Sequence, residues 1–333
     1  MYIIAEIGVN HDGILNKAFK LIDAAKECKC DAVKFQSFKA ERLVHLSAKK
    51  VQYQLRSGDK KESHYEMIRK LEFNDDKFVK AFNYANKIGI DFITTPYDPL
   101  SAKEAYEYGV RKFKTASADL SDFYLHKVIS SLKDIEIFIA TGMSKIENIK
   151  NTISLYKNLK PIILHCVSGY PCKDESINIR SFEVLKEIFP EFKLGFSDHS
   201  IDEIASIIAN TIGYTVFERH FTLDKNDEGP DHYASSNVEE MKSYVKNLRR
   251  VPKILGEAKK ETQEEEVGMS RRSKKAILTK TKVEKGEILS LDNTYALRPA
   301  ENGISIDNLN KILGKKFKTD LEKDVFIKSS DLI

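Results

Sequence analysis

Short β-rich runs recur along most of the chain, and each is followed by a stretch whose apolar residues have helical spacing. This alternation predicts a parallel sheet wrapped by helices, of the α/β class. In the first helical stretch the apolar residues define one face, at Ala18, Leu21, Ile22, Ala25 and Cys28. The eight predicted strands are IIAEIG from Ile3, DAVKFQ from Asp31, DFITTPY from Asp91, KFKTAS from Lys112, EIFIATG from Glu136, PIILHC from Pro161, KLGFSD from Lys193 and TVFERHF from Thr215.

Eight strand-and-helix repeats predict one (β/α)8 TIM barrel, a fold of roughly 250 residues that leaves room for a small second domain in a chain of 333. We expect the barrel at residues 1–257, with its last helix near Val238 to Leu255, and a compact C-terminal domain at 273–333. The charged run between them, 258–272, is interpreted as a solvated linker. The polar stretch at 49–70 interrupts the repeat and is expected to form an extended loop over the barrel mouth.

Composition narrows the classes of function. Lys and Arg total 54 against 50 Asp and Glu, so the chain carries no charge footprint for nucleic acid or for an anionic membrane. The N-terminal run MYIIAEIGVNH lacks a basic lead and contains a glutamate, and no apolar stretch reaches the length of a membrane span, which favours a cytoplasmic protein. The four cysteines, Cys28, Cys30, Cys166 and Cys172, lack paired CxxC spacing and are interpreted as reduced structural thiols.

Polar side chains, His165 among them, gather at the ends of the predicted strands, where TIM barrels carry their active sites. Residues two apart on a strand face the same side, which groups Ser197 with His199 and Glu218 with His220. His199 and His220 end neighbouring strands about 5 Å apart, so the two imidazoles can share one divalent ion. The alternative is that each histidine only forms hydrogen bonds in the barrel mouth.

Two lysines near strand ends, Lys34 and Lys114, predict an anion site, because buried ammonium groups are costly unless anions compensate them. The hydroxyls of Thr95, Ser117 and Ser197 would add hydrogen-bond donors for a phosphate and a carboxylate. Two alternatives stay open. Each lysine could pair with a neighbouring carboxylate, or one lysine could form a Schiff base with a carbonyl substrate.

Three carboxylates are candidates for proton transfer or substrate binding. Glu6 and Glu218 would move protons and position water. Asp231, in the run GPDHYAS, would hold substrate hydroxyls or a metal through its water shell, or it could simply cap a turn after Pro230. The run HDG from His11 is interpreted as the turn that starts the first helix.

At these residues the chain closely resembles the bacterial sialic acid synthases, which make N-acetylneuraminic, legionaminic or pseudaminic acid. The resemblance runs in order along almost the whole chain. Its most specific blocks are GFSDH followed by ERHFTLDK, with RPAENGIS in the C-terminal region. The other matching blocks are AEIGVNHDG, DAVKFQSFKAE, FITTPYD, KTAS, ATGM, LHC followed by YP, and GPDHYAS.

The resemblance implies a phosphoenolpyruvate-dependent enzyme with a TIM barrel followed by an antifreeze-like (SAF) domain, in a domain-swapped homodimer. Arg298 of one chain would reach the N-acyl group of the sugar in its partner, and His199 and His220 would bind manganese, or magnesium or cobalt in its place. Glu6, Glu218 and Lys114 would be catalytic. The implied phosphoenolpyruvate ligands are Lys34, Thr95, Lys114, Ser117 and Ser197, and the residues facing the sugar or a metal-bound water are Glu6, Gln36, Tyr170 and Asp231.

The departures from the family pattern concern the sugar. The family usually has SGE after the fourth strand, whereas here Ser117 is followed by Ala118 and Asp119, a shorter carboxylate that would have to reach further. Ser168 and Gly169 precede the YP where the family has larger polar residues. N-acetylmannosamine and a diacetamido-trideoxymannose both suit the motifs as the acceptor. A lysine-dependent pyruvate aldolase and a carbohydrate-binding protein without turnover are the alternative functions.

Overall fold

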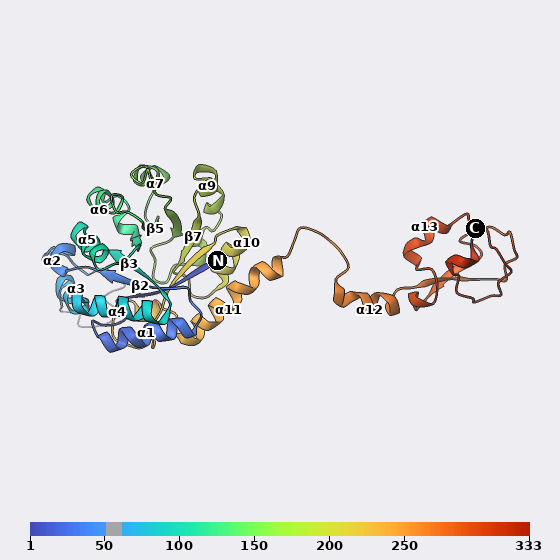
Figure 1. Ribbon diagram of the computed structural model, residues 1–333, viewed down its shortest axis with the longest axis horizontal. Coiled ribbons are helices and arrows are strands. Elements are labelled where there is room, and N and C mark those ends of the chain that lie inside the picture. The colour runs from blue at the N-terminus through green and yellow to red at the C-terminus, as the bar shows by residue number, and fades with distance from the viewer. Residues whose placement is uncertain (51–61) are drawn as a thin grey trace. The chain divides into compact units, whose positions relative to one another are not determined.

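Eight parallel strands form a closed barrel in chain order (Figure 1). The last strand, β8 (Val216–His220), pairs with the first, β1 (Tyr2–Gly8). The structure, a computed structural model, describes residues 1–50 and 62–333. Contacts divide the chain into two compact units, residues 1–256 and 257–333. The first unit is the TIM barrel that the alternation of strands and helices predicts.

Each barrel strand is short and is followed by at least one helix on the outside of the barrel (Figure 1). The strands are β1 (Tyr2–Gly8), β2 (Ala32–Ser37), β3 (Asp91–Pro96), β4 (Lys112–Thr115), β5 (Glu136–Ala140), β6 (Ile162–Cys166), β7 (Leu194–Asp198) and β8 (Val216–His220). The helices are α1 (Leu15–Glu27), α2 (Ala40–Leu43), α3 (His64–Leu71), α4 (Asp75–Ile88), α5 (Pro99–Glu107), α6 (Phe123–Ile129), α7 (Ile146–Ile153), α8 (Asp174–Ile177), α9 (Ser181–Ile188), α10 (Ile204–Ile212) and α11 (Val238–Leu255).

Alternate residues of the strands face the barrel interior or the helices. The outward residues pack with the helices in the main core, and the inward ones form a separate apolar cluster. Gly195 is required inside the barrel, because a Cβ atom there would lie 2.5 Å from Leu164 Cδ2 and 2.7 Å from the carbonyl oxygen of Val216. The inner cluster consists of Ile4, Ala32, Ile93, Phe138, Ile162, Leu164 and Val216. Glu6, Lys34 and Glu218 each follow a member of this cluster by two residues, so they share its side of the strand and lie nearer the C-terminal end.

Local sequence signals set the helix boundaries. The predicted apolar face of α1 is buried, and its centre, Leu21 and Ile22, is fully inaccessible to solvent. A capping box of Asn237 and Glu240 begins α11, which confirms the helix expected near Val238 to Leu255.

The expectation of an extended loop at 49–70 is wrong for its C-terminal part. Residues 51–61 lie outside the described residues, but α3 occupies His64–Leu71. Ser63 and Glu66 form a capping box at its start, and Met67 and Leu71 are buried. The spacing of these residues therefore favours a helix over a loop.

The second unit contains α12 (Glu264–Ser273), β9 (Ala276–Thr279), β10 (Thr294–Leu297) and α13 (Leu309–Ile312). The two strands pair antiparallel over a small core that includes Ile277, Leu289 and Phe317. Most of the segment predicted as a linker is helical, since α12 begins at Glu264, although its side chains are largely exposed.

The four cysteines are buried and free, as expected for structural thiols. Within residues 1–50 and 62–333, no helix combines the length and the apolar character that crossing a membrane requires.

Candidate active site

Two ammonium groups and two carboxylates meet at the C-terminal end of the barrel. Lys34 Nζ, from β2, lies 2.6 Å from Glu6 Oε2 of β1 and 3.8 Å from Glu218 Oε2 of β8. Lys114 Nζ, from β4, lies 2.9 Å from Glu218 Oε1. These side chains are at most 9% exposed. Each lysine thus pairs with a carboxylate, which is the first of the two alternatives given above for these lysines. The cluster has no net charge when both carboxylates are ionised.

The two carboxylates of this cluster differ in protonation. Burial raises the pKa of Glu6, because Lys34 offsets this effect only in part and the charge of Glu218 adds to it. Burial acts in the same direction on Glu218, but Lys114 and Lys34 outweigh it and hold the pKa of Glu218 well below its ordinary value. Ser197 Oγ also donates a hydrogen bond to Glu218 Oε1, at 2.7 Å. Glu218 is therefore the ionised member, and Glu6 takes up a proton more readily.

Hydroxyl groups surround the same charges. Lys34 Nζ donates to Thr95 Oγ1 at 3.0 Å. Ser117 Oγ accepts from the backbone N–H of Gly142 at 3.1 Å and lies 3.0 Å from Cys166 Sγ. Gln36 Nε2 donates to Glu6 Oε1 at 3.4 Å. One cavity of about 590 Å³ collects the predicted residues Glu6, Lys34, Gln36, Thr95, Lys114, Ser117, Tyr170, Ser197, His199, Glu218, His220 and Asp231.

The two imidazoles lie side by side at the ends of β7 and β8. The ring centroids of His199 and His220 are 5.6 Å apart, and the Tyr170 ring packs against both, at 4.4 and 5.6 Å. Burial lowers the pKa of both histidines, and for His220 the neighbouring His199 adds to this effect. Both rings are therefore neutral, which is the form that binds a metal ion.

The hydrogen bonds of these rings suit metal ligands. His199 Nδ1 donates to the Val167 carbonyl oxygen at 2.7 Å, which leaves the lone pair on Nε2. His220 Nδ1 is buried without a hydrogen-bond partner, and Asp231 Oδ2 is 3.8 Å away. These residues therefore fit a divalent ion. Within the described residues, no third His, Cys, Asp or Glu has a ligand atom within 4.8 Å of those of both His199 and His220. The other ligands of the ion would therefore be oxygen atoms of water or substrate. The three-residue group that does meet this distance is Asp12, Asp227 and His232, which lies elsewhere.

Three further predicted residues have different surroundings. Asp231 lines the cavity, and burial together with the charge of Glu6 raises its pKa to about 6. Asp119 ends the short 3-10 helix Ser117–Asp119 and is not among the residues that line the cavity. Burial and Asp122 raise the pKa of Asp119 to about 6. Arg298 directly follows β10 in the second unit and is exposed.

The prediction for the end of β6 is wrong by one residue. His165 faces the helices, where Nε2 lies 2.8 Å from the Ile177 carbonyl oxygen and the ring stacks on Phe196. Cys166, its neighbour, lines the cavity instead. Strand alternation would have identified Cys166, since Leu164 faces the barrel interior.

One wall of the cavity is apolar and is not among the predicted features of the site. It comes largely from α2, α3 and nearby residues, including Phe38, Leu43, Met67, Ile68 and Tyr97. Part of this wall could have been predicted, because a Ser-x-x-Glu sequence followed by apolar residues indicates the start of the amphipathic helix α3.

An ion pair on the outer face of the barrel aligns the strands that carry the imidazoles. Arg219 and Asp198 are register partners on β8 and β7, and Arg219 Nη1 lies 2.8 Å from Asp198 Oδ2. Both side chains are at most 7% exposed. This pair fixes the two strand ends relative to each other, so that His199 and His220 both reach the cavity.

Comparison with known proteins identifies the family. The NeuB family model matches residues 21–260, and the SAF domain model matches residues 274–333. The chain belongs to the NeuB family. The N,N'-diacetyllegionaminic acid synthase of Campylobacter jejuni is 35% identical over 331 residues, which cover 98% of each protein.

Other relatives of this chain differ in the acid they are named for. The human N-acetylneuraminate-9-phosphate synthase is 32% identical over 97% of this chain and 90% of its own length. The crystal structure of an N-acetylneuraminic acid synthetase from Leptospira borgpetersenii, in complex with citrate, matches with a TM-score of 0.69 and 31% identity. That match covers 80% of this chain and 89% of the other. The relatives thus agree on the class of product and differ in the particular acid.

Proposed function

We propose that this protein joins phosphoenolpyruvate to an open-chain N-acyl amino-hexose, giving a nonulosonic acid of the sialic acid type and phosphate. The observation that carries this proposal is the placement of Lys34 and Lys114 beside His199 and His220 in one cavity. Two cations suit the phosphate and carboxylate of phosphoenolpyruvate, and neutral imidazoles suit a metal. The names of the relatives support the same class of reaction.

Protonation of Glu6 would prepare the anion site. With both carboxylates ionised, the cluster offers no net charge to an anion. Because burial raises the pKa of Glu6, this residue gives up its negative charge more easily than Glu218 does. The ammonium group of Lys34 is then free to bind the anion, together with the hydroxyls of Thr95 and Ser197.

His199 and His220 would hold a divalent ion, for which manganese is our proposal. Such an ion supplies Lewis-acid polarisation of the sugar aldehyde oxygen. The protein's own contribution is to keep both imidazoles neutral and oriented, through burial and through the hydrogen bond from His199 to Val167.

The cluster of charges also suits the bond-making step. The methylene carbon of phosphoenolpyruvate attacks the aldehyde carbon, whose oxygen takes up a proton, and positive charge develops at the enol-ether carbon. Glu218, which stays ionised, would stabilise that charge. Glu6, protonated when the anion binds, would give its proton to the aldehyde oxygen and would then, as a carboxylate, accept a proton from the water that adds to the enol-ether carbon. The resulting tetrahedral species loses phosphate by cleavage of the carbon–oxygen bond.

The apolar wall of the cavity favours one of the two candidate acceptor sugars. N-acetylmannosamine carries a hydroxymethyl group at its far end, whereas 2,4-diacetamido-2,4,6-trideoxymannose carries a methyl and a second acetyl group. Phe38, Met67 and Ile68 offer the latter groups apolar contact. The second candidate function is therefore N,N'-diacetyllegionaminate synthesis, for which a preference for the trideoxy sugar in kcat/KM would be the evidence.

The rival functions make different predictions. A pyruvate aldolase needs a neutral amine, but Glu218 and Glu6 raise the pKa of Lys114 even though burial acts against them. Borohydride should therefore fail to trap pyruvate on Lys114. A carbohydrate-binding protein would bind the sugar and release no phosphate.

We propose that two chains form a domain-swapped homodimer in which Arg298 contributes to the partner's site. A stripe of exposed isoleucines along α10, with Ile204, Ile208 and Ile212 at 60%, 47% and 37% exposure, supports an interface between chains. Mixing an Arg298→Ala variant with a Lys114→Met variant should restore activity, because the mixed dimer would keep one intact site. If activity stays absent, the residues act within one chain.

The test of the proposed function is phosphate release from phosphoenolpyruvate with each of the two sugars, with and without a chelator. We expect release that depends on an acceptor, disappears with the chelator and returns with manganese. Phosphate release that is independent of any sugar, or turnover that resists metal removal, would contradict the proposal.

A further inference from the structure

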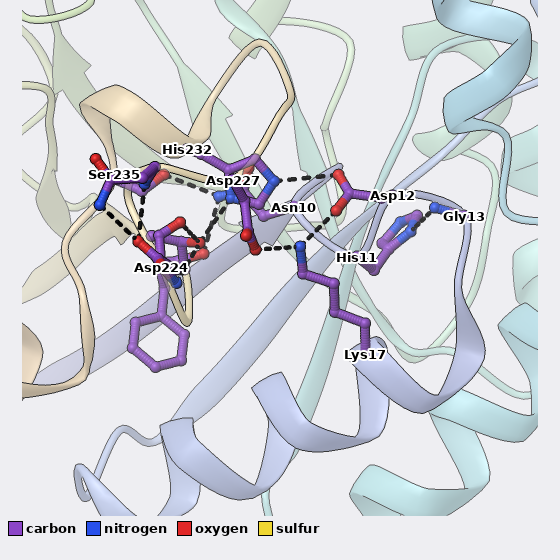
Figure 2. A network of polar contacts seen from close by, with 12 residues as sticks. Asn10, His11, Asp12, Gly13, Lys17, Asp224, Asp227, His232 and Ser235 are labelled. Atoms are coloured by element: carbon purple, nitrogen blue, oxygen red, sulfur yellow. Dashed lines mark hydrogen bonds and ion pairs between the residues drawn. The ribbon is translucent and has the colours of Figure 1, made fainter.

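A polar network joins the segment after β1 and the start of α1 to the segment between β8 and α11 (Figure 2). Lys17 Nζ lies 2.5 Å from Asp12 Oδ2 and 2.5 Å from Asp227 Oδ2. His232 Nε2 lies 3.1 Å from Asp12 Oδ1. Asp12, Asp227 and His232 have the composition of a metal site, but the ammonium group of Lys17 already takes the place of a cation between the carboxylates. The charges of the two carboxylates are therefore compensated within the protein, without a metal ion.

His232 is fixed on both sides of its ring. Partial burial acts to raise the pKa of Asp12, but the hydrogen bonds from His232 and Lys17 outweigh it and lower this pKa. An ionised carboxylate only accepts, so His232 Nε2 is the donor to Asp12. On the other side, Nδ1 lies 2.7 Å from Thr222 Oγ1. Gly229 packs against this ring, because a Cβ atom there would lie 2.7 Å from His232 Cδ2.

The residue next to His232 is Asp231, which lines the active-site cavity. Its segment has little regular structure of its own, apart from the short 3-10 helix His232–Ala234. Its position therefore depends on contacts with the rest of the barrel. Asn10 supplies two more of these contacts, because its Nδ2 donates to the Phe221 carbonyl oxygen at 2.9 Å and to Ser235 Oγ at 2.8 Å.

We propose that Asp12 and Lys17 are positioning residues for Asp231. Acting through His232 and Asp227, they hold segment 222–235 so that the Asp231 carboxylate stays in the cavity beside His220. This inference rests on the proposed function, in which Asp231 faces the acceptor sugar. Neither positioning residue touches the substrate, and their effect on the reaction passes through the segment.

The kinetic test compares Lys17→Met with Lys20→Met, an exposed lysine of the same helix, as the matched control. Removing the ammonium group leaves Asp12 and Asp227 without their shared partner. We expect KM for the acceptor sugar to rise about tenfold in Lys17→Met, with KM for phosphoenolpyruvate unchanged. Lys17→Arg, whose guanidinium can bridge two carboxylates, should restore most of the affinity. An equal change in both KM values, or no change, overturns the proposal.

A double variant separates positioning from a general structural effect. In an Asp231→Ala background the carboxylate to be positioned is gone, so Lys17→Met should add less than a twofold change in acceptor KM. If Lys17→Met costs the same factor with and without Asp231, it acts elsewhere and the proposal fails.

Hydrogen–deuterium exchange tests the proposal without catalysis. Amides of segment 222–235 should exchange faster in Lys17→Met than in Lys20→Met, while the barrel strands exchange equally in both. Unchanged exchange in this segment overturns the positioning role. If the wild-type protein releases no phosphate with any acceptor, the proposed function has failed, and exchange still decides whether Lys17 holds the segment.

Discussion

Replacing Glu218 by glutamine should reveal how the charges at the base of the cavity are balanced. The variant keeps the size of the side chain but removes the carboxylate that lies 2.9 Å from Lys114 and 3.8 Å from Lys34. Breaking a buried ion pair typically costs about 3–5 kcal/mol, because one charge remains without compensation. We expect the lower end, about 3 kcal/mol, since Lys34 keeps Glu6 at 2.6 Å.

Thermal unfolding measures this cost. For a domain of this size, each kcal/mol of lost stability lowers the thermal unfolding midpoint by about 2 °C, so the midpoint of the barrel should fall by about 6 °C. The control is Glu183→Gln, which removes an exposed pair with Arg180, whose side chain is 82% exposed, and should shift the midpoint by about 1 °C or less. Millimolar phosphoenolpyruvate should raise the thermal midpoint of the Glu218→Gln variant more than that of the wild type, because its anion would compensate Lys114, which has lost its carboxylate partner.

A variant as stable as the wild type without ligand would refute this reasoning. Lys114 would then not depend on Glu218 for its charge balance, and the assignment of Glu218 as the permanently ionised carboxylate would be lost.

Two further predictions concern stability. Burial lowers the pKa of His11 to about 3, whereas an unfolded histidine titrates near pH 6.5, so only the unfolded chain binds this proton in between. Stability should therefore fall as the pH drops below 6.5, by up to about 1.4 kcal/mol per pH unit, and the thermal midpoint of a His11→Gln variant should depend less on pH between 6.5 and 5. Gly195→Ala places a Cβ atom 2.5 Å from Leu164 Cδ2 and should destabilise the barrel by about 1–3 kcal/mol, which calorimetry would detect. An unchanged unfolding midpoint would show that the barrel interior yields at this position.

The sequence predicts those features of the site that depend on local periodicity. Strand alternation predicts that Ser197 and His199 share one side of their strand and that Glu218 and His220 share one side of the next strand. The structure brings all four to the same cavity. The order of strands follows from the chain order, because a barrel of repeated strand-and-helix units closes its first strand on its last.

The sequence does not predict features that depend on contacts between distant segments. The pairing of Lys34 with Glu6 and of Lys114 with Glu218 requires the register of several strands. Asp119 follows Ser117 by two residues, yet the 3-10 helix at this point takes it away from the cavity lining. The role of Lys17 likewise depends on segments more than two hundred residues apart, since its partner Asp227 is 210 positions along the chain.

The most direct test of the central claim is the fate of the oxygen atom of water. When phosphoenolpyruvate and the acceptor sugar react in ¹⁸O-labelled water, addition of water to the enol-ether carbon predicts ¹⁸O in the nonulosonic acid and unlabelled phosphate. Label found in the phosphate, with none in the sugar acid, would mean cleavage of the phosphorus–oxygen bond and would contradict the roles given to Glu6 and Glu218.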